Sequence, residues 1–296
     1  MRVWLLATMA VWGLNISMVK VLLPVFGPHG VGALRMVVAA ALLVAVALVM
    51  AVRSAKPWPR PDPRQWLGMA ACGVWMVALN QVLFLAGMAR TTATNAALII
   101  ALNPLLSSLV GAAMLRERLT RLRAIGVALG FGGVALVILH RPGADLGHGS
   151  LGDLLVLGSV ATWVTGGVIV HRLVRSGNRP LETGVVSAGV CALGAMVLLG
   201  YGVATQQPIV AVPARASFGL AALLVLSGLT ATGLGALVWN RALVTIGVAR
   251  TGLYAYWVPI FGVAFAVLLL GEPLTVWHLL GLAMVLGGTW FGTRGG

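Results

Sequence analysis

Apolar residues in this chain form continuous blocks of about twenty, separated by short segments that hold most of its prolines and charges. A helix of about 20 apolar residues crosses a hydrocarbon core of roughly 30 Å. Membrane β-strands would instead alternate polar and apolar positions over about ten residues. The pattern therefore predicts an all-α polytopic membrane protein with ten transmembrane helices, at residues 3–23, 31–52, 66–88, 92–115, 122–139, 151–171, 183–204, 217–239, 246–270 and 276–292.

Lysines and arginines predict which ends of these helices face the cytoplasm, because short cytoplasmic loops carry an excess of them. With the N-terminus inside, only Arg90, Arg141 and Arg215 fall in outer loops, whereas four arginines gather between residues 116 and 123 in one inner loop. Lys20 and Arg35 fall within helices near their outer ends, where they would snorkel to the interface or attract a carboxylate. Both termini are expected in the cytoplasm.

Two stretches, 113–133 and 268–288, share a pattern at a constant offset of 155 residues. The matching positions hold the same glutamate, leucine, threonine and glycines, and a proline matches further upstream: Glu117 and Glu272, Leu119 and Leu274, Thr120 and Thr275, Gly126 and Gly281, Gly132-Gly133 and Gly287-Gly288, Pro104 and Pro259. The chain is therefore divided into two related halves, 1–145 and 146–296. Five helices in each half require the second half to be inserted upside down.

The turns that hold the two glutamates have a structural explanation. Thr120 and Thr275 are the residue type that caps helix N-termini, and each glutamate lies in the short turn just before its threonine. We interpret Glu117 and Glu272 mainly as parts of these turns.

Composition agrees with a membrane protein and excludes several other classes. The chain is 60% hydrophobic and 9% charged, with a mean hydropathy of +1.01, whereas soluble domains are about a quarter charged. Its net charge of +14 comes from residues at the edges of apolar blocks, so no nucleic-acid partner is expected. Cys72 and Cys191 lie inside apolar blocks, which gives no support to a disulfide framework, a metal site or a cofactor.

The positions of the ionisable residues bear on chemistry and coupling. All six acids and all five histidines fall in loops or at helix ends, so the nucleophile and base of an intramembrane enzyme have no candidates at membrane depth. Proton coupling would have to use a peripheral acid such as Asp153 or Glu272, and facilitated diffusion needs none. A phosphorylated substrate is disfavoured, since only Lys20 and Arg35 enter the helices to any depth.

Polar and aromatic side chains at membrane depth are the candidates for lining a substrate path. Asparagines there also join helices, and Trp and Tyr also populate membrane interfaces. Aromatic walls with a few amides suit a mostly apolar solute that bears one or two polar groups. The candidates are Trp12, Asn15, Asn80, Gln81, Phe84, Asn95, Trp163, Trp239, Tyr254 and Trp257.

Pairs of glycines spaced four apart indicate where helices approach each other closely. Gly126 with Gly130, and Gly288 with Gly292, have this spacing. The pairs predict either close packing of two helices within the chain or the face of a homodimer.

Several segments resemble one known family over essentially the whole chain. They are the repeated "P…E-x-L-T…G…GG" pattern, "AVWGLNISMVK" (10–20), Arg35 early in the second helix, and "ARTTATNAALIIALNPL" (89–105). Together they resemble the EamA-type branch of the drug/metabolite transporter superfamily, and most of all its exporters of amino acids, including aromatic ones, and of other metabolites.

The resemblance implies a permease of the bacterial inner membrane, with a central cavity between the two halves and a small-molecule substrate, an amino acid or apolar metabolite. Inverted repeats allow alternating access by rocking one half against the other. A multidrug or neutral-metabolite exporter of the same fold is the alternative. An intramembrane enzyme and a structural or sensory protein are disfavoured.

Overall fold

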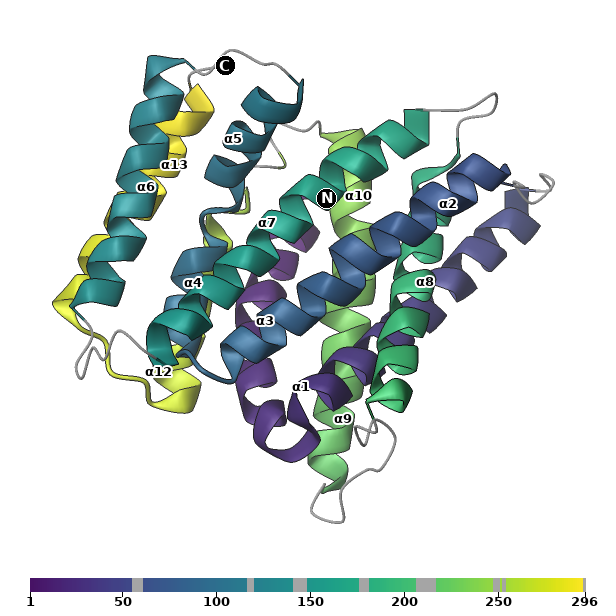
Figure 1. The fold of residues 1–296 in the computed structure, drawn as a ribbon, viewed down its shortest axis with the longest axis horizontal. Helices are drawn as coiled ribbons and strands as arrows, with labels where there is room; N and C mark the ends of the chain where they lie inside the picture. The colour runs from purple at the N-terminus through teal and green to yellow at the C-terminus, as the bar shows by residue number, and fades with distance from the viewer. Residues whose placement is uncertain are drawn as a thin grey trace.

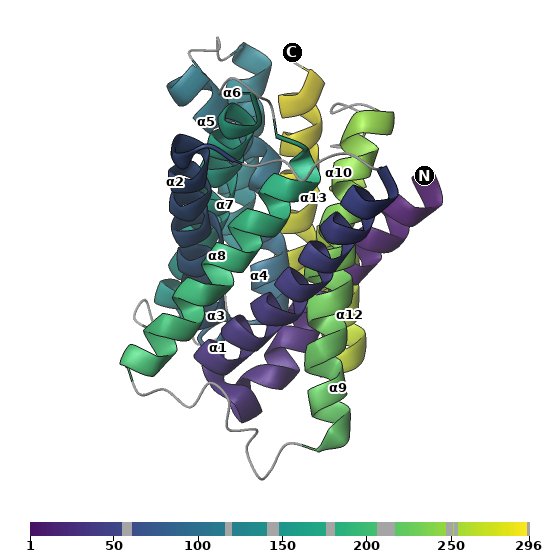
Figure 2. The same ribbon diagram turned by 90° about the vertical axis from the view of Figure 1, so that its right-hand side faces the viewer.

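A computed structural model describes residues 1–54, 61–115, 120–140, 148–175, 181–205, 217–246, 251 and 254–294 (Figures 1 and 2). Within these ranges the chain forms helices and no strands. The elements are α1 (Arg2–Ser54), α2 (Pro63–Cys72), η1 (Gly73–Leu79), α3 (Asn80–Met88), α4 (Ala93–Ile100), α5 (Asn103–Leu115), α6 (Arg121–Leu139), α7 (His148–Arg175), α8 (Thr183–Ala204), α9 (Phe218–Ser227), η2 (Gly228–Leu234), α10 (Gly235–Thr245), α12 (Trp257–Leu270) and α13 (Val276–Arg294).

Seven helical stretches in the described ranges are long and apolar enough to cross a membrane, and two shorter apolar helices follow them. The predicted all-helical, multi-pass membrane protein is therefore confirmed. The count of ten spans and the inverted relation of the halves stay predictions. The seven stretches are Arg2–Arg53, Pro63–Met88, Ala93–Gly111, Arg121–Leu139, Leu151–Val170, Gly184–Ala204 and Phe218–Trp239, and the shorter helices are Trp257–Leu270 and Val276–Gly292.

The first element, α1, turns back on itself near its middle (Figure 1). Gly27 has φ 66° and ψ 167° at this point, a conformation that a side chain disfavours and glycine permits. Pro24 and Pro28 flank it and interrupt the helical hydrogen bonds. The two helices predicted at 3–23 and 31–52 thus lie on either side of Gly27, within one continuous element.

The predicted helix at 92–115 is interrupted, forming α4 and α5. Pro104 lacks the N–H that would bond to the carbonyl of Ile100, and the Asn103 side-chain Nδ2 donates to that carbonyl at 3.0 Å instead. In the second half, α12 begins at Trp257, two residues before Pro259. The prolines therefore lie where regular helix stops or starts, whereas the predicted helices at 92–115 and 246–270 were continuous across them.

Two π-helical turns of seven residues interrupt longer helices, and the hydropathy pattern did not predict them. The first, η1, connects α2 to α3, and the second, η2, connects α9 to α10. Each begins where its backbone meets a neighbouring helix. A Cβ on Gly73 would lie 2.9 Å from Gly194 N in α8, and one on Gly228 would lie 2.9 Å from Arg35 O in α1.

The predicted helix end at 239 was wrong, since α10 continues to Thr245.

The helices α6 and α13 pack tightly along their whole length (Figure 1). A Cβ on Gly288 would lie 2.5 Å from Gly126 O, and one on Gly133 would lie 2.8 Å from Gly281 O. Because the residue numbers rise on one helix as they fall on the other, the two helices run antiparallel. The glycine pairs thus serve close packing within the chain. They no longer support a homodimer, which stays a prediction.

The main apolar core lies where α1, α3, α4 and α12 meet, and it excludes water from the centre of the molecule. Its fully buried side chains come from all four helices and include Leu22, Leu85, Met88, Leu98, Ile99 and Ala266. This core holds α1 and α4 in place beside the side chains of the candidate site.

Candidate functional site

Three of the predicted aromatic residues meet between α1, α10 and the segment before α12. The ring centroids of Trp12 and Trp239 are 5.5 Å apart. Tyr254 packs against the same small core as both tryptophans, formed by Leu5, Met9, Ala242 and Val258. All three aromatic side chains are partly exposed, so they form an accessible apolar surface. We call Trp12, Trp239 and Tyr254 the aromatic group.

A set of polar side chains lies next to the aromatic group, and its central member is Arg35 of α1. The Arg35 guanidinium Nη2 donates to Asn15 Oδ1 at 3.1 Å and to Thr232 Oγ1 at 3.4 Å. Ser227 Oγ donates to the same Asn15 oxygen at 2.7 Å. We call Asn15, Arg35, Ser227 and Thr232 the polar cluster; it joins both arms of α1 to α9 and η2.

The π-helical turn η2 orients the aromatic group relative to the polar cluster. Trp12 Nε1 donates to the carbonyl of Ala231 at 2.7 Å, and Ala231 immediately precedes Thr232. A Cβ on Gly235 would lie 2.5 Å from Trp12 Nε1, so the indole fits only because that position is a glycine. Irregular backbone at membrane depth is typical of functional sites, because it offers backbone groups to a side chain or ligand.

The predicted snorkelling of Arg35 is wrong, whereas that of Lys20, whose side chain is partly exposed, stays a prediction. Arg35 is only 3% exposed, because both arms of α1 and η2 enclose it. Lys20 Nζ donates to the carbonyls of Met88, at 2.8 Å, and of Thr91. These carbonyls lie at the end of α3 and in the turn after it, where a helix leaves acceptors unpaired.

The turn between α3 and α4 is also held by α7. Thr91 Oγ1 donates to the carboxylate of Asp153, which is 2% exposed. Asp153 was predicted as a peripheral acid at a helix end. The structure places it in the first turns of α7, enclosed against the α3–α4 turn.

Glu272 makes a long-range contact that the turn interpretation of the sequence did not predict. Its Oε1 accepts from Ala93 N at 2.7 Å, and its Oε2 accepts from Thr94 N at 2.8 Å and from Thr94 Oγ1 at 2.7 Å. The carboxylate therefore caps the N-terminus of α4, where the helix dipole also favours a negative charge. Its counterpart Glu117 lies outside the described residues.

The two predicted N-cap threonines differ. Thr120 Oγ1 accepts from Arg123 N at 3.3 Å, so its capping role is confirmed. The Thr275 hydroxyl lies 2.9 Å from His278 Nδ1, and the backbone N–H of Thr275 donates to the same ring nitrogen at 3.1 Å. The start of α13 is thus stabilised by contacts of the Thr275 hydroxyl and backbone N–H with the His278 ring.

The predicted amides of α3 and α4 have structural partners or are enclosed. Asn80 Nδ2 donates to Ser159 O of α7 at 2.7 Å, and Gln81 Nε2 lies 3.3 Å from Asn80 Oδ1. Asn80 therefore joins two helices, which is the alternative role of a membrane asparagine. Asn95 is 2% exposed, and Phe84 packs against the main core.

Trp163 and Trp257 lie on exposed faces, with 48% and 44% of their surfaces accessible. The Trp257 ring is 5.8 Å from that of Phe261. Within the described ranges, no close aromatic pair includes Trp163. Trp163 is thus not brought together with the aromatic group, whereas Trp257 contacts Phe261, which packs against the same small core as that group. The role of both tryptophans in a substrate path stays a prediction.

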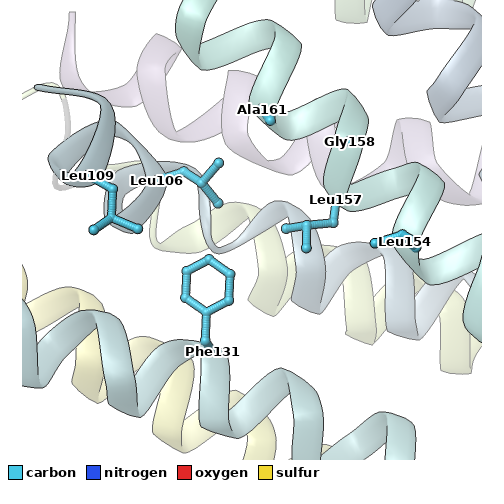
Figure 3. A pocket seen from close by; sticks show the side chains of 7 residues that line it. All are labelled: Leu106, Leu109, Phe131, Leu154, Leu157, Gly158 and Ala161. Atoms are coloured by element: carbon cyan, nitrogen blue, oxygen red, sulfur yellow. The ribbon is translucent and has the colours of Figure 1, made fainter. Parts of the chain in front are cut away.

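A separate hollow of about 420 Å³ lies between α5, α6 and α7 (Figure 3). It is lined entirely by apolar residues, namely Leu106, Leu109, Phe131, Leu154, Leu157, Gly158 and Ala161. None of the predicted path residues lines it. A site for a polar solute needs a few placed polar groups, so the hollow suits hydrocarbon and the polar cluster is the better candidate site.

The chain is similar to known proteins over most of its length. The model of the EamA-like transporter family matches twice, at residues 2–139 and 150–293. A Bacillus subtilis protein, the uncharacterized transporter YyaM, is 27% identical over 93% of this chain and 87% of its own length. A crystal structure with 19% sequence identity has a TM-score of 0.64 and covers 97% of this chain and 96% of its own.

Two further relatives have more specific names. A Streptantibioticus cattleyicolor protein named a probable terminal-alkyne amino-acid exporter is 27% identical over 97% of this chain and 91% of its own length. A Salmonella typhimurium protein named a probable amino-acid metabolite efflux pump is 26% identical over 98% of this chain and 93% of its own.

Proposed function

Because the chain belongs to the EamA-like transporter family, we propose that it exports aromatic or other apolar amino acids, or closely related metabolites. The family and the names of the relatives indicate a transporter and not an enzyme, as the sequence predicted. The names of two relatives support an amino-acid substrate. The observation that carries the proposal is the aromatic group beside the polar cluster, since a zwitterion with an apolar side chain needs both.

The proposed architecture has ten spans in two inverted halves, 1–145 and 146–296. Four observations support it: the two family matches, the reversal of α1 at Gly27, the interrupted helices before Pro104 and Pro259, and the 155-residue offset between η1 and η2. The glycines of α6 and α13 have the same offset. Gly126 faces Gly288, which is the counterpart of Gly133, and Gly133 faces Gly281, which is the counterpart of Gly126. Such reciprocity is expected across an axis that relates two repeats.

The proposed site lies at the boundary of the two halves. Trp12, Asn15 and Arg35 belong to the first half, and Ala231, Thr232 and Trp239 belong to the second. Rocking one half against the other would open this boundary to one side of the membrane and then to the other. A solute bound between the aromatic group and the polar cluster would thus meet each side in turn.

The proposed orientation has both termini in the cytoplasm of a bacterial inner membrane. The rule based on lysine and arginine places Lys20, Thr91, Asp153 and Glu272 at the outer face. Their segments meet around the α3–α4 turn, so four segments assigned independently to one face lie at one end of the molecule. This agreement supports a shared face for the four segments, and the excess of lysine and arginine at the opposite helix ends supports the cytoplasmic assignment of the other face.

Uptake into proteoliposomes tests the function directly. We expect purified protein to accelerate the entry of labelled phenylalanine or tryptophan, down a concentration gradient and without a pH gradient. Flux that requires a pH gradient would contradict facilitated diffusion and would point to Asp153 or Glu272 as the coupling acid. The absence of flux for all amino acids would contradict the proposed substrate, and a panel of apolar drugs and neutral metabolites would then test the alternative exporter.

Trp12→Phe tests whether the aromatic group takes part in transport. The change keeps an aromatic ring and removes the Nε1 donor to Ala231 O, a hydrogen bond worth about 1 kcal/mol. We expect the initial uptake rate to fall about 5-fold while the melting temperature stays near that of the parent. Trp4→Phe is the matched control, since Trp4 is 69% exposed. Equal loss in both variants would contradict a specific role for Trp12.

A further inference from the structure

Arg35 is a buried cation that has no acidic partner within the described part of the chain. Its side chain is 3% exposed, and its Nε and Nη1 atoms are buried without a hydrogen-bond partner among the described residues. Enclosing a charge away from water costs several kcal/mol unless an opposite charge or full hydrogen bonding compensates for it. A site of this kind is under-satisfied in the structure and is suited to an anion.

The neighbours of Arg35 are neutral. Asn15 and Thr232 accept from Nη2 alone, and Asn15 Oδ1 is shared with the Ser227 hydroxyl. These acceptors are weaker partners for a guanidinium than a carboxylate, whose two oxygens match two parallel N–H donors. Both Asn15 and Thr232 are partly exposed, so the polar cluster reaches a surface that a solute can approach.

The aromatic group and this cation contact neighbouring residues of η2. Ala231, which holds the Trp12 indole, adjoins Thr232, which contacts Arg35. An apolar or aromatic side chain on the tryptophans would therefore leave its carboxylate near the guanidinium. The site thus offers separate surfaces to the apolar side chain and to the carboxylate of an amphipathic acid.

We propose that Arg35 binds the carboxylate of the transported solute, which makes the substrates apolar or aromatic carboxylic acids, with zwitterionic amino acids among them. The proposal rests on the transport function proposed above and names the group that the site recognises. Since Arg35 joins Asn15 of the first half to Thr232 of the second, a carboxylate that competes for its donors also weakens a contact between the halves. Binding and the rocking motion are coupled through this one side chain.

Matched acids and amides test the proposal in detergent-purified protein. The probes are L-phenylalanine with L-phenylalaninamide, and 3-phenylpropionate with its amide, each titrated while the melting temperature is recorded. We expect at least one acid to bind the parent protein about 10-fold more tightly than its amide, which corresponds to about 1.4 kcal/mol. Arg35→Gln should remove this preference, and Arg35→Lys, which keeps the charge, should retain part of it.

Controls separate this proposal from the amino-acid function. Arg90→Gln alters an exposed arginine in the turn after α3, whose guanidinium donates to the carbonyl of Ala86, and it should keep the preference for acids. Arg35-dependent binding of 3-phenylpropionate without binding or flux of phenylalanine would contradict the amino-acid substrate and uphold the role of Arg35. Flux of phenylalanine with equal binding of acid and amide would uphold the amino-acid substrate and contradict the role of Arg35. Binding of neither acid by the parent, or an acid preference that survives in Arg35→Gln, would overturn the proposal.

Discussion

Gly126→Leu is expected to prevent α6 and α13 from packing, and to give little or no monodisperse protein. Even the Cβ of a side chain at this position would collide with Gly288 O and lie 2.7 Å from Gly292 N. Both atoms belong to backbone, so no rotamer change can relieve the contact. Gly126→Ala is expected to lower the free energy of unfolding by about 1–3 kcal/mol, the usual cost of overpacking.

Size-exclusion chromatography and thermal melts in detergent measure this effect. Gly132→Ala is the control on the same helix, because its Cβ would meet only the flexible end of Met284, at 3.5 Å. It should melt close to the parent. If Gly126→Leu gave normal yield and an unchanged melting temperature, the backbone contact between α6 and α13 would be refuted.

Glu272→Ala is expected to free the start of α4 and to reduce uptake at least about 10-fold. The substitution removes a carboxylate that accepts from two backbone N–H groups and one hydroxyl of α4. Hydrogen bonds to a charged group are worth about 1.5–3 kcal/mol, and the donors left behind lose their partner. Glu272→Gln keeps an acceptor oxygen but loses the charge, so its uptake rate should lie between those of parent and alanine variant.

Hydrogen exchange gives the decisive measurement for Glu272, since peptides that cover residues 93–100 should exchange faster in Glu272→Ala. Glu182 is the matched control, because it occupies an N-cap position at α8 without a side-chain capping bond. Glu182→Ala should leave exchange and uptake unchanged. Unaltered protection of α4 in Glu272→Ala would show that this cap does not form in the membrane.

Hydropathy predicted the positions of most helices to within a few residues because each apolar block determines its own helix. The predicted segments 122–139 and 183–204 compare with Arg121–Leu139 and Thr183–Ala204. The glycine pairs predicted close packing within the chain as one of two alternatives, but not the antiparallel contact of α6 with α13. Glycine spacing indicates that a helix is approached closely, but it carries no information about which helix approaches.

The missed features depend on partners that are distant in the sequence. Glu272 reads as a turn residue because its partners, Ala93 and Thr94, lie in the other half of the chain. The sequence suggested that Arg35 lies at the membrane interface, because it is close to the end of a predicted helix. Its burial follows from the approach of η2, and a π-helical turn has no local sequence pattern of the kind that caps and prolines provide.

The two π-helical turns have a consequence for the history of the gene. A π-turn contains one more residue per hydrogen-bonded ring than an α-helical turn, so a single inserted residue can be accommodated without moving the helix on either side. Gly73–Leu79 and Gly228–Leu234 lie at the offset that relates the two proposed repeats. If the two proposed repeats arose by duplication, the insertion occurred once in a five-helix ancestor, before its coding sequence was copied and the copies were joined. The bulged helix is then older than the ten-helix protein itself.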